Sequence, residues 1–94
     1  MSLRKLIEGE KVYIHIGEDL NIRAKDIIAI LDQESVSSSE LFLEFLNRHQ
    51  NKVINLSKKI FKSVIITSDY VYLSPIASGT LKKRSIQRNM QEFL

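Results

Sequence analysis

The 94-residue sequence contains no cysteine, one proline and three glycines. Without cysteine the chain has neither a disulfide framework nor a thiolate metal site, which suits a reducing compartment. No apolar run approaches the roughly 20 residues that a membrane-spanning helix needs. The N-terminal basic residues are not followed by an apolar stretch that would make a signal peptide. These absences predict a soluble cytoplasmic protein with no membrane partner.

The polar residues form no recognisable catalytic set. The three glycines are isolated, so no glycine-rich loop cradles a phosphate. The two histidines, His15 and His49, fall on different predicted elements and lack metal-ligand spacing. His49 falls near the apolar face at the end of a predicted helix, where a packed or capping histidine is commoner than a ligand. We therefore expect no enzyme, no metal site and no cofactor.

Charge is divided unevenly along the chain. Residues 1–50 hold six Lys or Arg against nine Asp or Glu, and residues 51–94 hold eight against two. The halves therefore carry −3 and +6, consistent with the net charge of +3. A basic half on a small domain is typical of nucleic-acid binding. The alternative is an acidic end and a basic end that attract each other or assemble head to tail, and charge alone favours this alternative.

Three segments in the first third of the chain are predicted to be strands: residues 11–16, 20–23 and 27–31. In the first, Ile14 and Ile16 face one way while Tyr13 and His15 face the other. The third is a short apolar run, and its β-branched content and length favour a strand over a helix. Gly17 begins a turn signal between the first two segments.

The middle of the chain predicts one helix. Residues 35–39 are a mostly polar stretch that we predict to be non-helical, and Ser37 with Glu40 forms a capping box. The helix should run to about His49 or Gln50 with no proline or glycine to interrupt it. Four residues make up its apolar face: Leu41, Phe42, Phe45 and Leu46.

The last third predicts a β-hairpin and a second helix. Residues 61–67 and 70–74 are strands separated by two turn residues. Pro75 ends the second strand because it cannot donate to a ladder. The terminal helix opens with Ser78 or Thr80 as its cap. Its predicted apolar stripe is Ile86, Met90, Phe93 and Leu94.

Together these elements predict an α+β fold in the order β-β-β-α-β-β-α. The expected architecture is a small, mainly antiparallel sheet of about five strands with two helices. We expect residues 11–94 to form a single domain, and residues 1–10 to be either a native N-terminal extension or residues added to the natural sequence.

Cationic residues gather at three places that we predict to form a DNA-binding surface. One place is just before the central hairpin, one follows the second strand, and one lies on the terminal helix. A phosphate-binding surface needs several such cations. Each group alone would be typical of the solvent-exposed cations found at strand ends and on helix faces. The eight residues are Lys58, Lys59, Lys62, Arg23, Lys25, Lys82, Lys83 and Arg84.

Four blocks of the sequence occur in a specific order: YIHIGED, KDIIAILD, KSVIIT and YLSPIASGTLKKR. They begin at Tyr13, Lys25, Lys62 and Tyr72. In this order they resemble the RemB branch of the Rem family, which comprises small bacterial regulators of extracellular-matrix (biofilm) genes. The resemblance runs from about residue 12 to residue 84, and its most specific part is the last block.

The resemblance implies a transcriptional regulator that binds double-stranded DNA as a ring-like homo-oligomer, in the cytoplasm and associated with the nucleoid. In the related RemA branch, DNA-contacting arginines lie in segments that correspond here to residues 23–26 and 57–62. Asp26 stands where that branch has an arginine, and lysines replace arginine in the second segment. Lysine lacks the planar fork for bidentate contacts, and aspartate repels phosphate.

Two alternatives stand beside DNA binding. The departures from arginine favour an oligomeric interaction module that modulates a partner regulator without touching DNA. Binding of RNA or single strands would require exposed aromatic side chains for stacking, and Tyr13, Tyr70 and Tyr72 are the available tyrosines.

Overall fold

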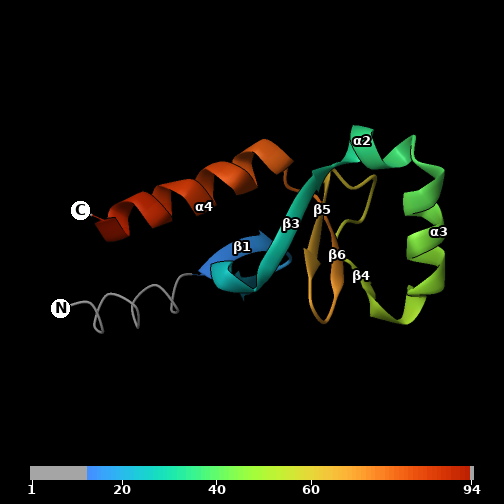
Figure 1. Cartoon of the computed structure of the whole chain (residues 1–94), viewed down its shortest axis with the longest axis horizontal. Coiled ribbons are helices and arrows are strands. Elements are labelled where there is room, and N and C mark those ends of the chain that lie inside the picture. The colour runs from blue at the N-terminus through green and yellow to red at the C-terminus, as the bar shows by residue number, and fades with distance from the viewer. Residues whose placement is uncertain (1–12, 94) are drawn as a thin grey trace.

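The structure is a computed structural model that describes residues 13–93, with side chains through Ser85. Two sheets and the helices around them make up an α+β fold, which confirms the predicted class (Figure 1). The first sheet is the antiparallel hairpin of β1 (Tyr13–Gly17) and β2 (Leu20–Arg23). Both residues of its turn, Glu18 and Asp19, have positive φ, as tight hairpin turns require.

The second sheet has four strands in the order β3-β5-β6-β4. Its strands are β3 (Ile27–Asp32), β4 (Val53–Asn55), β5 (Ser63–Thr67) and β6 (Val71–Ser74). The β5–β6 hairpin was predicted and is confirmed, although β5 begins two residues later than expected. Strand β4 was not predicted, and it pairs parallel to β6 while the other pairs are antiparallel.

Side chains that alternate along the central hairpin divide the core into two clusters. Ile65 and Tyr72 belong to a cluster with Ile14, Ile16 and other residues of the first sheet. Val64 and Val71 belong to a second cluster that includes Val36. Because neighbouring residues of a strand point to opposite faces, the two clusters lie on opposite faces of the four-stranded sheet.

Each face of the sheet has its own cover. The β1–β2 hairpin and α4 (Ser78–Phe93) lie on one side, and α2 (Gln33–Ser37) and α3 (Glu40–Arg48) lie on the other (Figure 1). A 3-10 turn, η1 (Ala24–Asp26), joins β2 to β3, and another, η2 (Gln50–Lys52), leads into β4.

The helical predictions are confirmed in part. Helix α3 spans the expected residues, but its cap is Ser39, whose Oγ accepts a 3.1 Å hydrogen bond from the Phe42 backbone N–H. The predicted cap Ser37 is wrong because it belongs to α2, in a stretch predicted to be non-helical. Phe42, Phe45 and Leu46 pack on the sheet, whereas Leu41 is 81% exposed and does not.

Helix α4 also begins differently from the prediction. Ser78 is its first residue and Thr80 lies inside it, so neither stands before the helix as a cap. The Ser78 hydroxyl instead donates to Asp32 Oδ1 at 3.1 Å, which fixes the start of α4 beside the end of β3. The predicted apolar stripe beyond Ser85 lies outside the described side chains.

Candidate nucleic-acid interface

The loop between β4 and β5 presents the first cationic group. Lys58, Lys59 and Lys62 are all exposed. The loop is fixed at one end by Leu56, which is buried and donates its N–H to Leu73 O at 2.8 Å. At the other end Phe61 packs into the core cluster of α3. These anchors hold the loop, so the three lysines project from a defined backbone.

Hydrogen bonds fix the loop further. Lys62 N donates to Ser74 O at 2.8 Å, and Lys62 O accepts from Gln33 N at 3.1 Å. Ser57 Oγ donates to Lys59 O at 3.2 Å and also accepts from Lys59 N at 3.3 Å. Backbone bonds of this kind leave the lysine ammonium groups available to solvent or to an anion.

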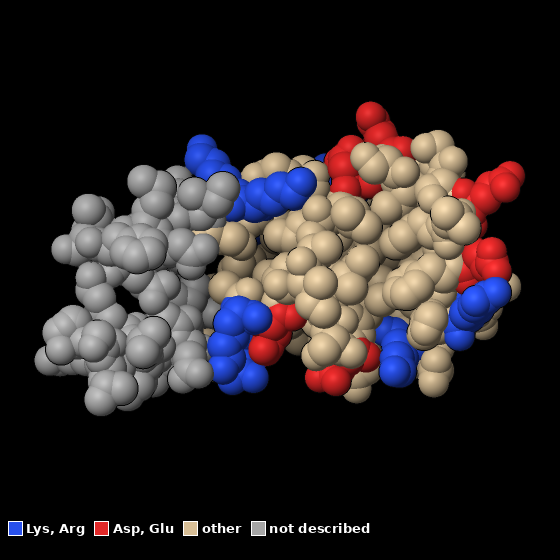
Figure 2. Space-filling view, viewed as in Figure 1, with Lys and Arg blue, Asp and Glu red and all other residues tan. Residues whose placement is uncertain are grey.

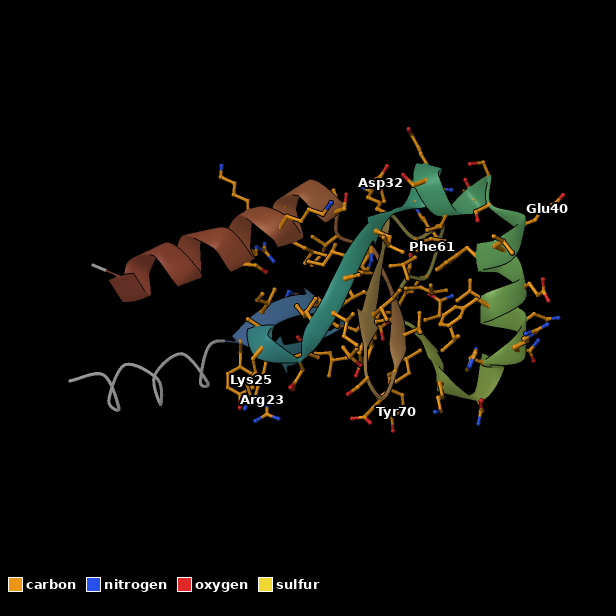
Figure 3. The ribbon with its side chains drawn as sticks, viewed as in Figure 1. Arg23, Lys25, Asp32, Glu40, Phe61 and Tyr70 are labelled. Atoms are coloured by element: carbon orange, nitrogen blue, oxygen red, sulfur yellow. The ribbon has the colours of Figure 1, made fainter. Side chains whose placement is uncertain are left out.

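The second group, Arg23 and Lys25, lies at the start of β3. Arg23 Nε donates to Asp26 Oδ2 at 3.0 Å, and both side chains remain more than 40% exposed. Figure 3 shows Arg23 and Lys25 together at one edge of the molecule, while Asp32 lies at the opposite edge. The ion pair compensates part of the charge that this group would offer to a phosphate.

The third group lies on α4. Lys82, Lys83 and Arg84 are exposed, and Arg84 Nη1 donates to His15 O at 3.2 Å. Lys82 lines a groove of about 320 Å³ whose other residues are Ala24, Ile27, Ile28, Ala29, Ile30 and Ser85. The groove brings α4 beside the segment that carries Arg23 and Lys25.

The structure therefore separates the first predicted group from the second. Helix α4, which carries the third group, starts beside Asp32 at one end of β3, and its Lys82 shares a groove with Ala24 near the other end. Lys62 adjoins the Asp32 end of β3, because Ser63 pairs with Asp32. Arg23 and Lys25 precede the Ile27 end. A six-residue strand separates these ends by roughly 17–20 Å. On the face in Figure 2 the Lys and Arg side chains likewise do not merge into one patch, and Asp and Glu gather at the upper right.

His49 and Tyr72 have structural surroundings, whereas the His15 side chain is exposed. The His49 ring packs on Phe45 with centroids 4.6 Å apart, and its Nδ1 lies 2.9 Å from Phe45 O, which confirms the predicted packing role. Tyr72 is buried, and this burial, followed by nearby negative charge, raises the pKa of its hydroxyl above the usual 10.0. Tyr13 and Tyr70 are about half exposed. With Tyr72 buried, the three tyrosines do not form a stacking row.

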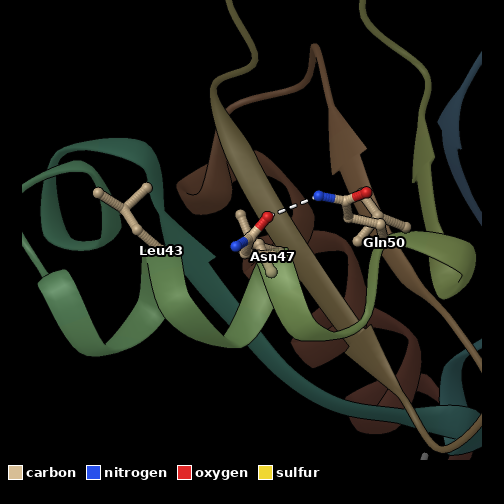
Figure 4. A pocket seen from close by; sticks show the side chains of 5 residues that line it. Leu43, Asn47 and Gln50 are labelled. Carbon is tan, nitrogen blue, oxygen red and sulfur yellow. Dashed lines mark hydrogen bonds between the residues drawn. The ribbon is translucent and has the colours of Figure 1, made fainter.

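A second groove, of about 390 Å³, runs between α3 and the edge strand β4 (Figure 4). It is lined by Leu43, Leu46, Asn47, Gln50 and Val53, and Gln50 Nε2 donates to Asn47 Oδ1 at 2.6 Å. No titratable side chain lines it, so it offers no acid–base chemistry. Among residues 13–85, no three His, Asp or Glu side chains gather as a metal site would require.

Sequence reasoning missed four exposed aliphatic side chains. Ile28 is 68% exposed, Leu43 52% and Ile60 78%, in addition to Leu41. Ile28 stands in an apolar run that reads as buried, and Leu43 falls outside the predicted apolar face of its helix. The signal for Leu43 was present in the sequence, since a leucine on the polar side of an amphipathic helix is out of pattern.

No helix within the described part of the chain is both long enough and apolar enough to cross a membrane.

Comparisons with known proteins agree on one family. A model of a RemA-like family, described as extracellular matrix regulatory protein A-like, matches residues 13–85. Extracellular matrix regulatory protein B of Bacillus subtilis (strain 168) is 36% identical over 74 residues, which cover 79% of this chain and 90% of that protein.

Proposed function

The chain belongs to the RemA-like family of extracellular matrix regulatory proteins, and from this premise we propose that it is a transcriptional regulator of matrix genes that binds double-stranded DNA as a ring-like homo-oligomer. The family assignment confirms the resemblance predicted from the sequence. The family name supports a regulatory role. DNA binding and ring assembly are proposals that go beyond the family name.

The exposed lysine loop is the observation that carries the proposal. Lys58, Lys59 and Lys62 project from a loop held at both ends by Leu56 and Phe61. Flexible ammonium groups on a fixed backbone suit contact with the phosphate backbone of DNA, which needs charge more than planar geometry. None of the three side chains makes an ion pair with a residue in the described range 13–85.

Assembly would compensate for the small number of cations on one protomer. Three lysines give only weak binding, because each contact adds a modest term that salt screens. A ring repeats the loop, so that once one loop is bound the others meet the same duplex at a high effective concentration. Binding of this kind discriminates between sequences mainly through bending and groove shape rather than through base edges.

Fluorescence anisotropy of a labelled AT-rich duplex, at low and near-physiological salt, tests the proposal. We expect binding at low salt and a loss of affinity of orders of magnitude as salt rises, as for proteins that neutralise roughly 6–10 phosphates. No binding at low salt would contradict the DNA-binding function.

The Arg23–Asp26 ion pair favours a second candidate function. It reduces the available charge in the segment where the sequence resemblance places DNA-contacting arginines. An oligomeric interaction module that modulates a partner regulator would tolerate this pairing. That function predicts a stable assembly with no DNA affinity at physiological salt, so the same titration separates the two.

A further inference from the structure

Helix α3 carries an exposed apolar surface bordered by acids. Leu43 is 52% exposed and lines the 390 Å³ groove between α3 and β4. Glu40 lies three residues before it, on the same face of the helix. Glu40 is exposed and makes no ion pair with any residue in the range 13–85, whereas Glu44 is paired with Arg48 at 2.6 Å. We call this the α3 face, made of Glu40, Leu43 and the groove beside them.

A complementary surface lies on the opposite side of the sheet. Ile28 is 68% exposed and shares the 320 Å³ groove with Lys82 of α4. We call this the β3 face, made of Ile28, Lys82 and their groove. The ionic group of the β3 face is the Lys82 ammonium, and that of the α3 face is the Glu40 carboxylate, so the two faces carry opposite charge.

The conformation of β3 explains why Ile28 projects. The register with β5 shifts between Ile27 and Ala29, so Ile28 is the extra residue of a β-bulge. A bulge on an edge strand turns the edge away from strand addition and re-aims the side chain. Ile28 is therefore presented as an apolar knob, and side-chain docking is favoured over pairing of two β3 edges.

From these two faces we infer that protomers assemble head to tail, with the β3 face of one copy docked on the α3 face of the next. Ile28 would enter the groove beside Leu43, and Lys82 would meet Glu40 of the neighbouring copy. A contact between different faces is heterologous, and repeating it closes a ring when the rotation allows. This inference rests on the proposed homo-oligomer and names its interface.

The opposite charges of the two halves of the chain agree with this arrangement. Glu40 comes from the −3 half and Lys82 from the +6 half. Docking would remove Ile28 and Leu43 from water, which are both exposed and both line grooves. The arrangement assigns Lys82 to assembly and leaves the lysine loop outside the interface, free for DNA.

Mixing two defective variants tests the inference by sedimentation velocity. Ile28→Asp damages only the β3 face, and Leu43→Asp damages only the α3 face. We expect each variant alone to be monomeric, while a mixture forms a 1:1 heterodimer through the one intact pair of faces. Both sites are more than half exposed, so neither change should disturb folding, which circular dichroism checks.

A matched control and a charge exchange complete the test. Ile60→Asp alters an isoleucine that is 78% exposed and outside both faces, so it should keep the wild-type mass. Lys82→Glu and Glu40→Lys should each weaken assembly at least tenfold, and the double variant should recover it. The inference fails if the single variants keep the wild-type mass or if the mixture stays monomeric. A monomeric wild type would instead contradict the proposed oligomer itself.

Discussion

Ser74 Oγ donates a 2.7 Å hydrogen bond to the backbone oxygen of Ile16, 58 residues earlier in the chain. Both residues are completely buried. The same hydroxyl accepts from Ile76 N at 3.0 Å. Because Ser74 belongs to the four-stranded sheet and Ile16 to the β1–β2 hairpin, this one hydroxyl links the two sheets where the hairpin covers the core.

Ser74→Ala should therefore lower the free energy of unfolding by about 1–3 kcal/mol, because it leaves a buried carbonyl and a partly buried N–H without their partner. Urea denaturation measures the change. Ser68→Ala, in the exposed turn between β5 and β6, is the control and should change stability by less than about 0.5 kcal/mol. Equal effects at the two serines would show that the link between the sheets contributes little.

Gly17→Ala should destabilise the protein by about 1–3 kcal/mol, since Gly17 has φ of +134°, which L residues rarely adopt. An added Cβ would also lie 2.9 Å from Pro75 Cδ, too close for an unshifted contact. Thermal unfolding compares it with Gly79→Ala, where the added Cβ has no described atom within 4 Å apart from its chain neighbours and the backbone of its own helix. In the first turn of α4 that change should be neutral or stabilising by up to about 1 kcal/mol, and a loss of stability there would count against this explanation.

Tyr72 should make the stability of the fold fall at high pH. Burial raises the pKa of its hydroxyl above 10.0, with smaller contributions from Tyr70, Asp69 and Asp26. The folded state thus holds the proton more tightly than the unfolded state. The resulting stability is complete below pH 10.0 and is lost as pH rises through the higher pKa of the folded state.

Tyr72→Phe keeps the packed ring and removes the ionisable group, so its free energy of unfolding should fall less above pH 10.0 than that of the wild type. Urea titrations on both sides of that pH measure the difference. If the free energy of unfolding falls equally in the two proteins at high pH, groups other than Tyr72 cause the loss of stability.

The sequence predicted those parts of the fold that depend on local pattern. Alternation and a two-residue spacing identified the β5–β6 hairpin, and amphipathic periodicity identified α3. Strand β4 escaped prediction because it has three residues and exists through a parallel pairing with β6. Helix α2 escaped because its serine-rich sequence is polar apart from Val36, whose burial in the core holds it.

The N-cap of α3 shows a limit of prediction from local sequence. Ser37 and Ser39 both precede the helix at plausible distances, and Ser37 matches the capping-box pattern with Glu40. The helix instead begins after Ser39, because residues up to Ser37 are already helical in α2. The choice of the capping serine depends on where the preceding helix α2 ends. The capping-box pattern alone does not predict that position.

The sequence identified the residues of the candidate site but not their arrangement in space. The cationic groups were evident from the sequence, and their exposure agrees with a surface role. Their arrangement depends on α4, which starts beside Asp32 at one end of β3 and places Lys82 in a groove shared with Ala24 and β3. No local pattern encodes that path.

The lysine loop is best tested by a double variant, Lys58→Ala with Lys59→Ala, in the anisotropy titration. We expect weaker binding to every duplex and an unchanged assembly mass. The salt dependence should have a slope shallower by about 0.9 for each phosphate that the variant no longer neutralises. Lys52→Ala, an exposed lysine outside the loop, is the control and should bind nearly as the wild type. Unchanged affinity in the double variant would remove the loop from the DNA-binding surface and contradict the central claim.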